Sequence, residues 1–310
     1  MEELALTQNA TFGMGYIANG VELQPGDEIL QTDQEHIGGK SSWEMRAKRH
    51  GAIWKSAAIP MPPNDPAEII RRFKEAINPK TKVLAIPHQT SMLGLVLPVK
   101  ELIELGRKQG HPNIFIVIDG AQSVGQIDVN VVELGCDAYV MSPHKWLLAP
   151  PGSGALFIKR GRQKEVWTTI ASGAWADYEK GAYRFMQVGT GNRSIYDGMK
   201  AALEFRHFLG QERVSRRIHA LGTHLRDGLR QIRGVEIISS VHPKLAAGIT
   251  TYKVAGMTGP QVMDAFWRKK YRVRSMGDEN GVRHSLHIYN TMKDVDTALS
   301  MVSDLAVGKG

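Results

Sequence analysis

Two polar residues of this chain follow consecutive apolar runs and could carry chemistry together. Asp119 ends the run Ile114-Phe115-Ile116-Val117-Ile118, and Lys145 lies in the turn Ser142-Pro143-His144-Lys145 after the next run. A lysine amine can form a Schiff base with an aldehyde, and a carboxylate can keep a heterocyclic nitrogen protonated. Hydroxyl and imidazole groups beside the lysine can bind a phosphate. The set therefore predicts a site for an aldehyde cofactor such as pyridoxal phosphate.

Each residue also has an ordinary interpretation. Asp119 fits the N-cap of a helix that begins at Gly120, and Lys145 fits an exposed, solvated lysine. The apolar residues that follow the lysine, 146–148, favour a buried turn instead. Burial and cationic neighbours would lower the pKa of Lys145, so that its amine could act as nucleophile and then as proton carrier.

The elements that must position these residues alternate through the first two thirds of the chain. Apolar runs predict strands at 28–32, 52–58, 82–87, 114–119, 137–142 and 154–159, and helical periodicity predicts helices at 14–23, 42–50, 66–77, 99–109 and 122–134. This alternation indicates an α/β fold with a mainly parallel sheet covered on both faces. Ligands of such sheets bind at the carboxyl ends of strands, where Asp119 and Ser142 fall.

The pattern changes after Trp175. A helical stretch at 192–233 precedes predicted strands at 235–239, 248–254, 272–276 and 282–289, with helices at 259–269 and 292–307. We interpret this region as a smaller α+β domain. The predicted domains are 1–204 and 205–310.

Composition excludes several classes of protein. The 310 residues are 42% hydrophobic, without the apolar run of about 18 residues that a membrane span needs, and the first residues lack the pattern of a secretory signal. A single cysteine, Cys136, fits the reducing cytoplasm. The net charge of +8 comes from scattered basic residues without a recognition motif, so we expect no nucleic-acid partner. We also expect no metal site.

Three motifs together carry a resemblance. Asp119-Gly120-Ala121-Gln122, Ser142-Pro143-His144-Lys145 and the segment from Arg283 to Thr291 resemble the class V aminotransferase family. These are pyridoxal-phosphate enzymes of the aspartate-aminotransferase fold (fold type I), including cysteine desulfurases, selenocysteine lyases, isopenicillin N epimerases and hercynylcysteine sulfoxide lyases. The resemblance covers essentially the whole chain. It implies a large cofactor-binding domain, a smaller C-terminal domain, and a Schiff base on Lys145.

The resemblance also implies roles for individual residues. His36 would stack on the cofactor ring and act in catalysis with Lys145 and Asp119. Arg283 would bind the substrate carboxylate by a bidentate fork. The Gly189-Thr190 pair would reach the cofactor phosphate of a neighbouring subunit, which implies a homodimer with a shared active site. The implied cofactor-binding residues are Ala10, Thr11, Ser91, Asp119, Gln122, Ser142, His144, Lys145 and Thr190.

Several of these residues keep simpler interpretations when taken alone. Thr11 fits a helix N-cap, although a helix N-terminus also attracts a phosphate. His36 fits a solvated loop histidine, and Arg283 a surface arginine on a strand. For Gln122, which the resemblance places at the cofactor's phenolic oxygen, the simpler interpretation is a residue in the first turn of a helix.

The chain departs from the family pattern in three places. It begins almost at the phosphate loop, so the segment that usually precedes this loop is expected to be missing. Two explanations are left open, a truncated gene product and the loss of an export signal. The region 272–282 has no cysteine that could accept sulfur as a persulfide, and Cys136 is predicted to be a core residue. Ser91 stands where desulfurases tend to have asparagine, which favours the epimerase and sulfoxide-lyase branch.

We therefore expect a pyridoxal-phosphate enzyme that acts at the α-carbon of an amino acid or amino-acid derivative. An isopenicillin N epimerase-like or C–S lyase-like reaction is favoured, with an aminotransferase, a desulfurase or selenocysteine lyase, and a non-catalytic binding protein as alternatives. The segment 13–18 also fits G-x-G-x-x-A, so a dinucleotide enzyme is a further alternative. Trp175, Tyr178 and Arg184 are candidate contacts to the substrate side chain.

Overall fold

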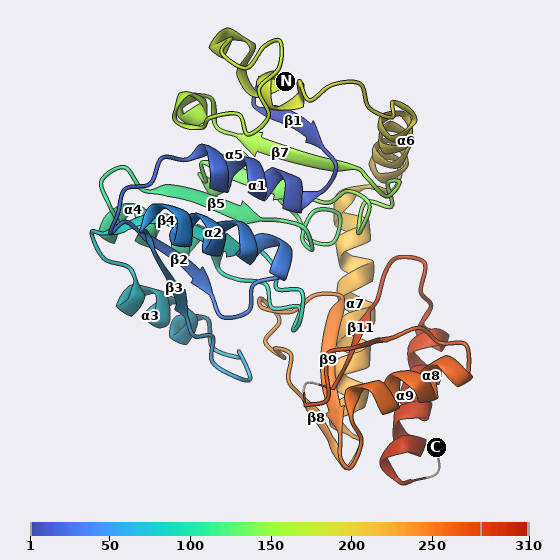
Figure 1. Cartoon of the computed structure of the whole chain (residues 1–310). Helices are drawn as coiled ribbons and strands as arrows, with labels where there is room; N and C mark the ends of the chain where they lie inside the picture. The colour runs from blue at the N-terminus through green and yellow to red at the C-terminus, as the bar shows by residue number, and fades with distance from the viewer. Residues whose placement is uncertain (1, 280, 309–310) are drawn as a thin grey trace. The chain divides into compact units, whose positions relative to one another are not determined.

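The structure is a computed structural model that describes residues 2–279 and 281–308, and the chain divides into two compact units (Figure 1). The first unit comprises Met1–Ile59, Ala67–Gln89 and Pro98–Leu209. The second comprises Pro60–Pro66, Thr90–Leu97 and Gly210–Gly310. The predicted boundary at residue 205 lies inside helix α6 (Ser194–Leu209), and two short segments from the first half of the sequence belong to the second unit.

A seven-stranded sheet forms the centre of the first unit. Its order is β1-β7-β6-β5-β4-β2-β3, and the five strands from β6 to β3 run parallel, whereas β7 is antiparallel to both β6 and β1. The mainly parallel α/β sheet predicted from the sequence is thereby confirmed. The strands are β1 (Leu4–Thr7), β2 (Glu28–Thr32), β3 (Ile53–Ala57), β4 (Thr81–Pro87), β5 (Phe115–Asp119), β6 (Ala138–Met141) and β7 (Gly154–Ile158).

Both faces of this sheet are covered, which explains why β5 is continuously apolar. Phe115 and Val117 point into one core cluster, which also contains Met14 of α1 (Ala10–Gly20) and Trp43 of α2 (Ile37–His50). The alternate residue Ile116 faces α4 (Val99–Gln109). There a Cβ built on Gly106 would lie 3.2 Å from the Ile116 Cδ1 atom. A further helix, α3 (Pro66–Ala76), lies between β3 and β4 in the sequence.

Among the predicted helices whose bounds differ from the structure, two depart most, and glycines explain both of these differences. The predicted helix at 122–134 is reduced to α5 (Val131–Leu134), because Gly125 has a φ of +95° and its backbone passes close to that of Trp146. The predicted helix at 192–233 is two helices, α6 and α7 (Gln211–Arg230), which are separated at Gly210 with a φ of +79°. Left-handed backbone of this kind interrupts a helix.

The second unit contains a four-stranded antiparallel sheet of order β10-β11-β9-β8. Helices α7, α8 and α9 supply apolar residues to its core, among them Leu225, Phe266 and Val302. Its other elements are β8 (Val235–Ile237), β9 (Ile249–Val254), α8 (Gly259–Arg268), β10 (Arg274–Ser275), β11 (Val282–Ser285) and α9 (Met292–Ala306). No described helix is both long enough and apolar enough to cross a bilayer.

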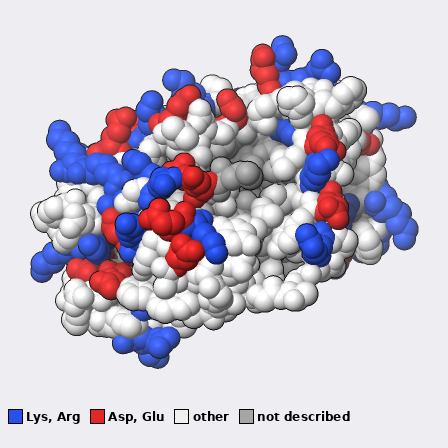
Figure 2. All heavy atoms as spheres, turned by 90° about the horizontal axis from the view of Figure 1, so that it is seen from above, with Lys and Arg blue, Asp and Glu red and all other residues white. Residues whose placement is uncertain are grey.

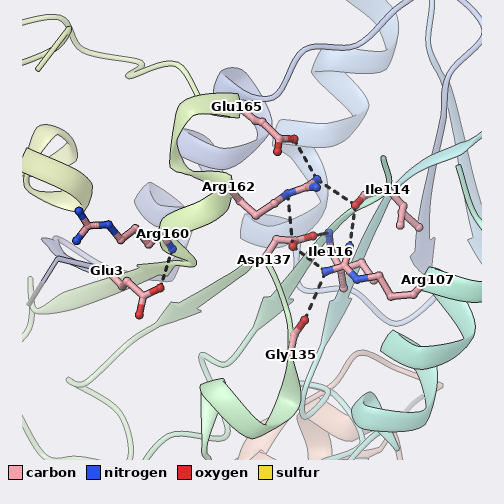
Figure 3. Close-up of polar contacts among 9 residues, drawn as sticks. All are labelled: Glu3, Arg107, Ile114, Ile116, Gly135, Asp137, Arg160, Arg162 and Glu165. Atoms are coloured by element: carbon pink, nitrogen blue, oxygen red, sulfur yellow. Dashed lines mark hydrogen bonds and ion pairs between the residues drawn. The ribbon is translucent and has the colours of Figure 1, made fainter. Parts of the chain in front are cut away.

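A buried acid connects the amino-terminal ends of the central strands (Figure 3). The Asp137 carboxylate accepts a hydrogen bond from the Ile116 N–H at 2.7 Å and another from Arg107 Nη2 at 2.7 Å, and Arg162 Nε lies 3.5 Å away. Both arginines also donate to the Ile114 carbonyl, at 2.8 and 3.1 Å. Arg162 comes from the 3₁₀ helix η1 (Arg160–Glu165), so this cluster joins α4, β5, the start of β6 and η1.

The surface charge is mixed. Figure 2 shows a face on which Lys and Arg side chains are interspersed with Asp and Glu around uncharged residues. The excess of basic residues therefore does not form one continuous basic surface on this face.

Candidate active site

Asp119 ends β5, and its carboxyl group is buried. Its Oδ1 accepts a hydrogen bond from the Ala121 N–H at 2.9 Å, which fixes the orientation of the group. Burial raises the pKa of Asp119 above its ordinary value, and this hydrogen bond and the nearby Lys145 and His36 side chains oppose the increase. A carboxyl in this setting gains stabilisation from a nearby cation, which fits a protonated ring nitrogen.

The start of α2 lies close to this carboxyl and consists there of two glycines, Gly38 and Gly39. A Cβ built on Gly39 would lie 3.0 Å from Asp119 Oδ2, and one built on Gly38 would lie 2.3 Å from Thr11 Oγ1. Any side chain at these two positions would therefore clash with Thr11 or crowd the acid. The Gly38-Gly39 pair thus allows the start of α2 to lie close to Asp119 and Thr11.

The turn that carries Lys145 is tied to the start of α1. The Lys145 N–H donates to the Ser142 carbonyl at 3.0 Å, and Ser142 Oγ accepts a hydrogen bond from the Ala10 N–H at 3.0 Å. Lys145 itself is half-buried, and Trp146 is buried, as the apolar residues after the lysine predicted. The lysine turn and the first turn of α1 are thus held side by side.

The first turn of α1 is suited to an anion because its N–H groups and the helix dipole attract negative charge. Asn9 caps this helix, since its side chain accepts from the Phe12 N–H at 3.0 Å. The simpler interpretation of Thr11 as the N-cap is therefore wrong. The Thr11 side chain is exposed at this helix end, as a phosphate-binding role requires.

The orientation of Gln122 follows from a contact within the same unit. Its Oε1 accepts a hydrogen bond from the Trp146 indole N–H at 2.8 Å. The carbonyl end of the amide is therefore engaged, and the NH₂ end is the one that can donate to a ligand oxygen. This polarity suits an acceptor such as a phenolic oxygen.

The two histidines of the set have defined tautomers. His144 Nδ1 lies 2.9 Å from the Ser153 carbonyl oxygen. Because a carbonyl can only accept a hydrogen bond, Nδ1 carries the proton of the neutral ring. Nε2 can therefore donate to a phosphate only when the ring is cationic. His36 is the N-cap of α2, and its Nδ1 accepts from the Gly38 N–H at 3.1 Å. His36 is exposed but anchored by this cap, in contrast to a histidine on a loose loop.

Two residues of the set lie in the second unit, and they contact each other. Arg283 Nη1 donates to the Ser91 carbonyl and lies 3.3 Å from Ser91 Oγ. Burial, together with the charge of Arg274, lowers the pKa of Arg283 to about 10, so the side chain is still cationic at neutral pH. Arg283 is half-buried and anchored, and is not the freely solvated surface arginine of the simpler interpretation.

The remaining candidates lie in the segment that follows η1. Thr190 is exposed. Arg184, in the 3₁₀ helix η2 (Tyr178–Met186), is buried and donates to the carbonyls of Trp175, Gln163 and Val166 at 2.9–3.0 Å. Its guanidinium is buried and bound to these three backbone carbonyls, so its assignment as a substrate contact is wrong. Trp175 is exposed and stacks on Trp167 with ring centroids 6.3 Å apart.

Sequence reasoning missed Glu35, a second carboxyl beside Asp119. Thr32 donates to Glu35 Oε1 through its N–H at 3.0 Å and its hydroxyl at 2.8 Å, and Glu35 Oε2 would lie 3.7 Å from a Cβ on Gly39. Burial, with contributions from Asp119 and Asp33, raises the pKa of Glu35 to about 8. Its place directly before His36, after the carboxyl end of β2, is the signal that could have identified it.

It also missed a buried polar pair behind Asp119. The His88 N–H donates to the Asp119 carbonyl at 2.8 Å, and His88 Nδ1 lies 2.8 Å from the Tyr139 hydroxyl. Burial lowers the pKa of His88 to about 4, so the ring is neutral. His88 directly follows β4, and a polar residue at the carboxyl end of a parallel strand was again the available signal.

Comparisons with known proteins show the family to which the chain belongs. The sequence profile of the family described as aminotransferase class-V matches residues 1–298. The chain is 30% identical to an isopenicillin N epimerase of Streptomyces clavuligerus, over 94% of this chain and 77% of that protein. It is 33% identical to a probable cysteine desulfurase of Mycolicibacterium paratuberculosis, over 92% of this chain and 43% of that longer protein.

Solved structures show the same fold. A mutant of C-DES with glycine covalently linked to the PLP cofactor matches with a TM-score of 0.88 and 25% identity, over 98% of this chain and 81% of that one. The apo cysteine desulfurase of Thermococcus onnurineus matches with a TM-score of 0.87 and 25% identity, over 99% and 80% of the two chains. With a profile match over nearly its full length, this chain belongs to the class V aminotransferase family of pyridoxal-phosphate-dependent enzymes.

Proposed function

We propose that this protein acts at the α-carbon of an amino acid or amino-acid derivative, by epimerisation or by cleavage of a C–S bond. The observation that carries the proposal is the buried carboxyl of Asp119 at the carboxyl end of β5, with Lys145 and His36 near enough to oppose the rise of its pKa. The similarity to an isopenicillin N epimerase and to cysteine desulfurases supports this choice of reactions.

Each residue of the set has a role in this proposal. Pyridoxal phosphate, when bound, supplies an electron sink for negative charge at the α-carbon. Asp119 would keep a positive charge on the ring nitrogen, and His36 would stack on the ring. Lys145 holds the cofactor through its amine and then removes the α-proton with Nζ. Ala10, Thr11, Ser142 and His144 hold the phosphate, while Gln122 donates to the phenolic oxygen and Ser91 completes the cofactor-binding set.

Arg283 binds the substrate carboxylate in this proposal. Its guanidinium offers a planar fork that matches a carboxylate, and the Ser91 carbonyl already holds one of its nitrogens. Holding the carboxylate orients the α-carbon, and the orientation of the bonds at that carbon decides which of them breaks.

A desulfurase that passes sulfur to its own cysteine is a weaker candidate. Cys136 is the only cysteine in these 310 residues, and it is buried beside Asp137. Burial raises the pKa of its thiol to about 12, so it is protonated at neutral pH and is a poor nucleophile. Direct loss of a β-sulfur group from the substrate needs no protein thiol.

The single cysteine also fits our proposal of a cytoplasmic enzyme.

We also propose a homodimer in which Thr190 reaches the neighbouring subunit's cofactor phosphate. Thr190 is exposed, as such a contact requires. Sedimentation of the loaded protein should give the mass of a dimer, and a Thr190→Ala variant should lose cofactor on dilution faster than wild type. A fully active monomer would remove this part of the proposal.

The role of Lys145 is tested by reducing the cofactor-loaded protein with borohydride and mapping the modified peptide by mass spectrometry. Wild type and a Lys159→Ala control should carry the cofactor on Lys145, and Lys145→Ala should carry none. A covalently bound cofactor in Lys145→Ala would contradict the assignment.

The reaction is tested by incubating the enzyme in heavy water with D- and L-amino acids and cysteine conjugates. Deuterium should enter the α-position of a substrate, with an inverted centre for an epimerase or release of a sulfur product for a lyase. A keto acid that forms only with an added keto-acid acceptor, and without release of ammonia or a sulfur product, would instead identify an aminotransferase. If Lys145 carries the cofactor and no compound exchanges its α-proton, the protein is a non-catalytic binder.

A further inference from the structure

A buried amide, that of Gln31, lies on β2 beside the core of the first unit, and its side chain is fully buried. Ile29, two residues earlier on the same face of the strand, belongs to the core cluster that also contains Trp43. An apolar side chain at position 31 would pack there without the cost of removing an amide from water. The burial of Gln31 therefore has to be offset by hydrogen bonds.

Both ends of this amide are hydrogen-bonded. The Trp54 indole N–H donates to Gln31 Oε1 at 2.9 Å, and Gln31 Nε2 donates to the Gly39 carbonyl at 3.2 Å. An indole N–H can only donate and a carbonyl can only accept, so these two partners allow the amide one orientation. Trp54 lies on β3, which pairs with β2, and Gly39 lies in the first turn of α2. Gln31 thus joins two neighbouring strands to the start of α2.

Trp54 makes a second contact with the same turn of α2. The Lys40 Nζ atom lies 4.6 Å from the centroid of the Trp54 ring, a distance typical of a cation–π interaction. Gly39 and Lys40 are adjacent in the chain, so two successive residues of this turn are bound from the sheet. We call Gln31 and Trp54 together the β2–β3 clamp.

The turn bound by the β2–β3 clamp is the one that carries His36. The Gly39 and Lys40 N–H groups donate to the His36 carbonyl at 2.8 and 3.0 Å, and His36 Nδ1 accepts from the Gly38 N–H at 3.1 Å. The backbone and the imidazole of His36 are therefore both tied to this turn. On another side the turn lies against the acid of the site, since a Cβ built on Gly39 would lie 3.0 Å from Asp119 Oδ2. A shift of the turn would move His36 relative to Asp119.

We propose that the β2–β3 clamp positions the first turn of α2 against Asp119 and thereby places the His36 imidazole where it stacks on the cofactor ring. Gln31 and Trp54 are then positioning residues, which act through His36 and touch neither cofactor nor substrate. The amide supplies orientation more than net stability, because its two bonds replace bonds to water in the unfolded chain. This inference rests on the proposed function, and it adds the residues that fix the geometry of the site.

The test uses the cofactor-loaded protein and the visible circular dichroism of its cofactor, which reports the asymmetry of the contacts on the ring. Gln31→Met keeps an unbranched side chain of similar length and removes both hydrogen bonds. Its signal should differ from wild type in the same direction as that of His36→Ala, and by at least half as much. The kcat of α-proton exchange should fall about tenfold, with KM within about twofold of wild type, because substrate binding does not depend on His36.

The decisive comparison repeats Gln31→Met in a His36→Ala background. A clamp that acts through His36 has nothing left to position there, so the added substitution should change kcat by less than about twofold and leave the circular dichroism unchanged. A general loosening of the fold would instead lower kcat by the same factor in both backgrounds. Equal losses in the two backgrounds overturn the proposal, and so does a His36→Ala variant that keeps the wild-type signal and kcat.

Gln163→Met is the matched control. Gln163 is also a buried glutamine, and its Nε2 donates to the carbonyls of Ile158 and Glu2 at 3.0 and 2.8 Å, neither of which belongs to α2. This variant should lose stability in urea as Gln31→Met does and keep the wild-type circular dichroism of the cofactor. An equal change of that signal in Gln163→Met would show that any lost buried amide disturbs the site, which overturns the proposal.

A second variant covers the case in which Gln31→Met does not fold. Trp54→Phe removes the indole donor and leaves Gln31 in place, and it should shift the cofactor signal in the same direction by a smaller amount. A wild-type signal in folded Gln31→Met, or in Trp54→Phe where Gln31→Met does not fold, overturns the proposal. A failure of the underlying function has a different signature. If wild type binds the cofactor and exchanges no α-proton, the proposed reaction is wrong, whereas the circular dichroism needs no substrate and still decides the role of the clamp.

Discussion

Replacing Glu35 with glutamine should make the protein less sensitive to alkaline pH. Two hydrogen bonds from Thr32 reach Glu35 Oε1, and burial beside Asp119 raises the pKa of the Glu35 carboxyl to about 8. In the unfolded chain a glutamate titrates near pH ~4.3. Between these two values the folded state holds a proton that the unfolded state has released. The stability of wild type therefore falls as the pH rises through this window.

The magnitude follows from the linkage relation. The loss is about 1.4 kcal/mol per pH unit inside the window and levels off above the folded pKa. From pH ~6 to pH ~9 wild type should therefore lose about 2–3 kcal/mol through Glu35, an upper value because this side chain keeps some exposure to water. Glutamine cannot ionise, and its amide oxygen can still accept both bonds from Thr32. The stability of Glu35→Gln relative to wild type should thus rise by this amount over the same range.

Urea unfolding followed by circular dichroism at both pH values measures this difference, because titrating groups that do not interact with Glu35 contribute equally to both proteins. Glu44→Gln is the matched control, because Glu44 is an exposed carboxylate of α2 that pairs with Lys40 at 3.1 Å. This change should alter stability by less than ~1 kcal/mol. If Glu35→Gln and wild type follow parallel curves from pH ~6 to ~9, the Glu35 carboxyl is ionised normally and the reasoning from burial is refuted.

Two further substitutions test the framework around the site. Asp137→Ala should destabilise the protein by about 3–5 kcal/mol in urea unfolding, because it leaves Arg107 and the Ile116 N–H without their buried partner. Glu165→Ala, which removes only a surface pair with Arg162, should lower stability by less than ~1 kcal/mol, and equal effects of the two changes would contradict the role of burial. Gly120→Ala should lower stability by about 1–3 kcal/mol, because its Cβ would lie 1.9 Å from the Tyr139 ring, and an unchanged unfolding midpoint would show that the ring moves aside at no cost.

The α/β class and the positions of Asp119 at the end of a strand and of Lys145 in the turn after the next one could be predicted from the sequence alone. Both follow from local patterns, since a buried parallel strand must be apolar throughout and its polar neighbour must lie at its end. The motifs around these two residues were specific enough to indicate the family and its cofactor. The break at Gly210 was missed because helical periodicity continues across it, whereas a left-handed glycine ends the helix.

Which distant residues share an environment depends on the tertiary structure. Glu35 was unremarkable in the sequence, because its raised pKa arises from burial beside Asp119. The pairing of Arg274 with Arg283 depends on the register of a hairpin, and a shift by one residue would send one of them to the opposite face. Hydrophobic periodicity predicts which side of its own helix or strand a residue occupies. The burial of that residue and the charges near it depend on the residues that other elements place against that side.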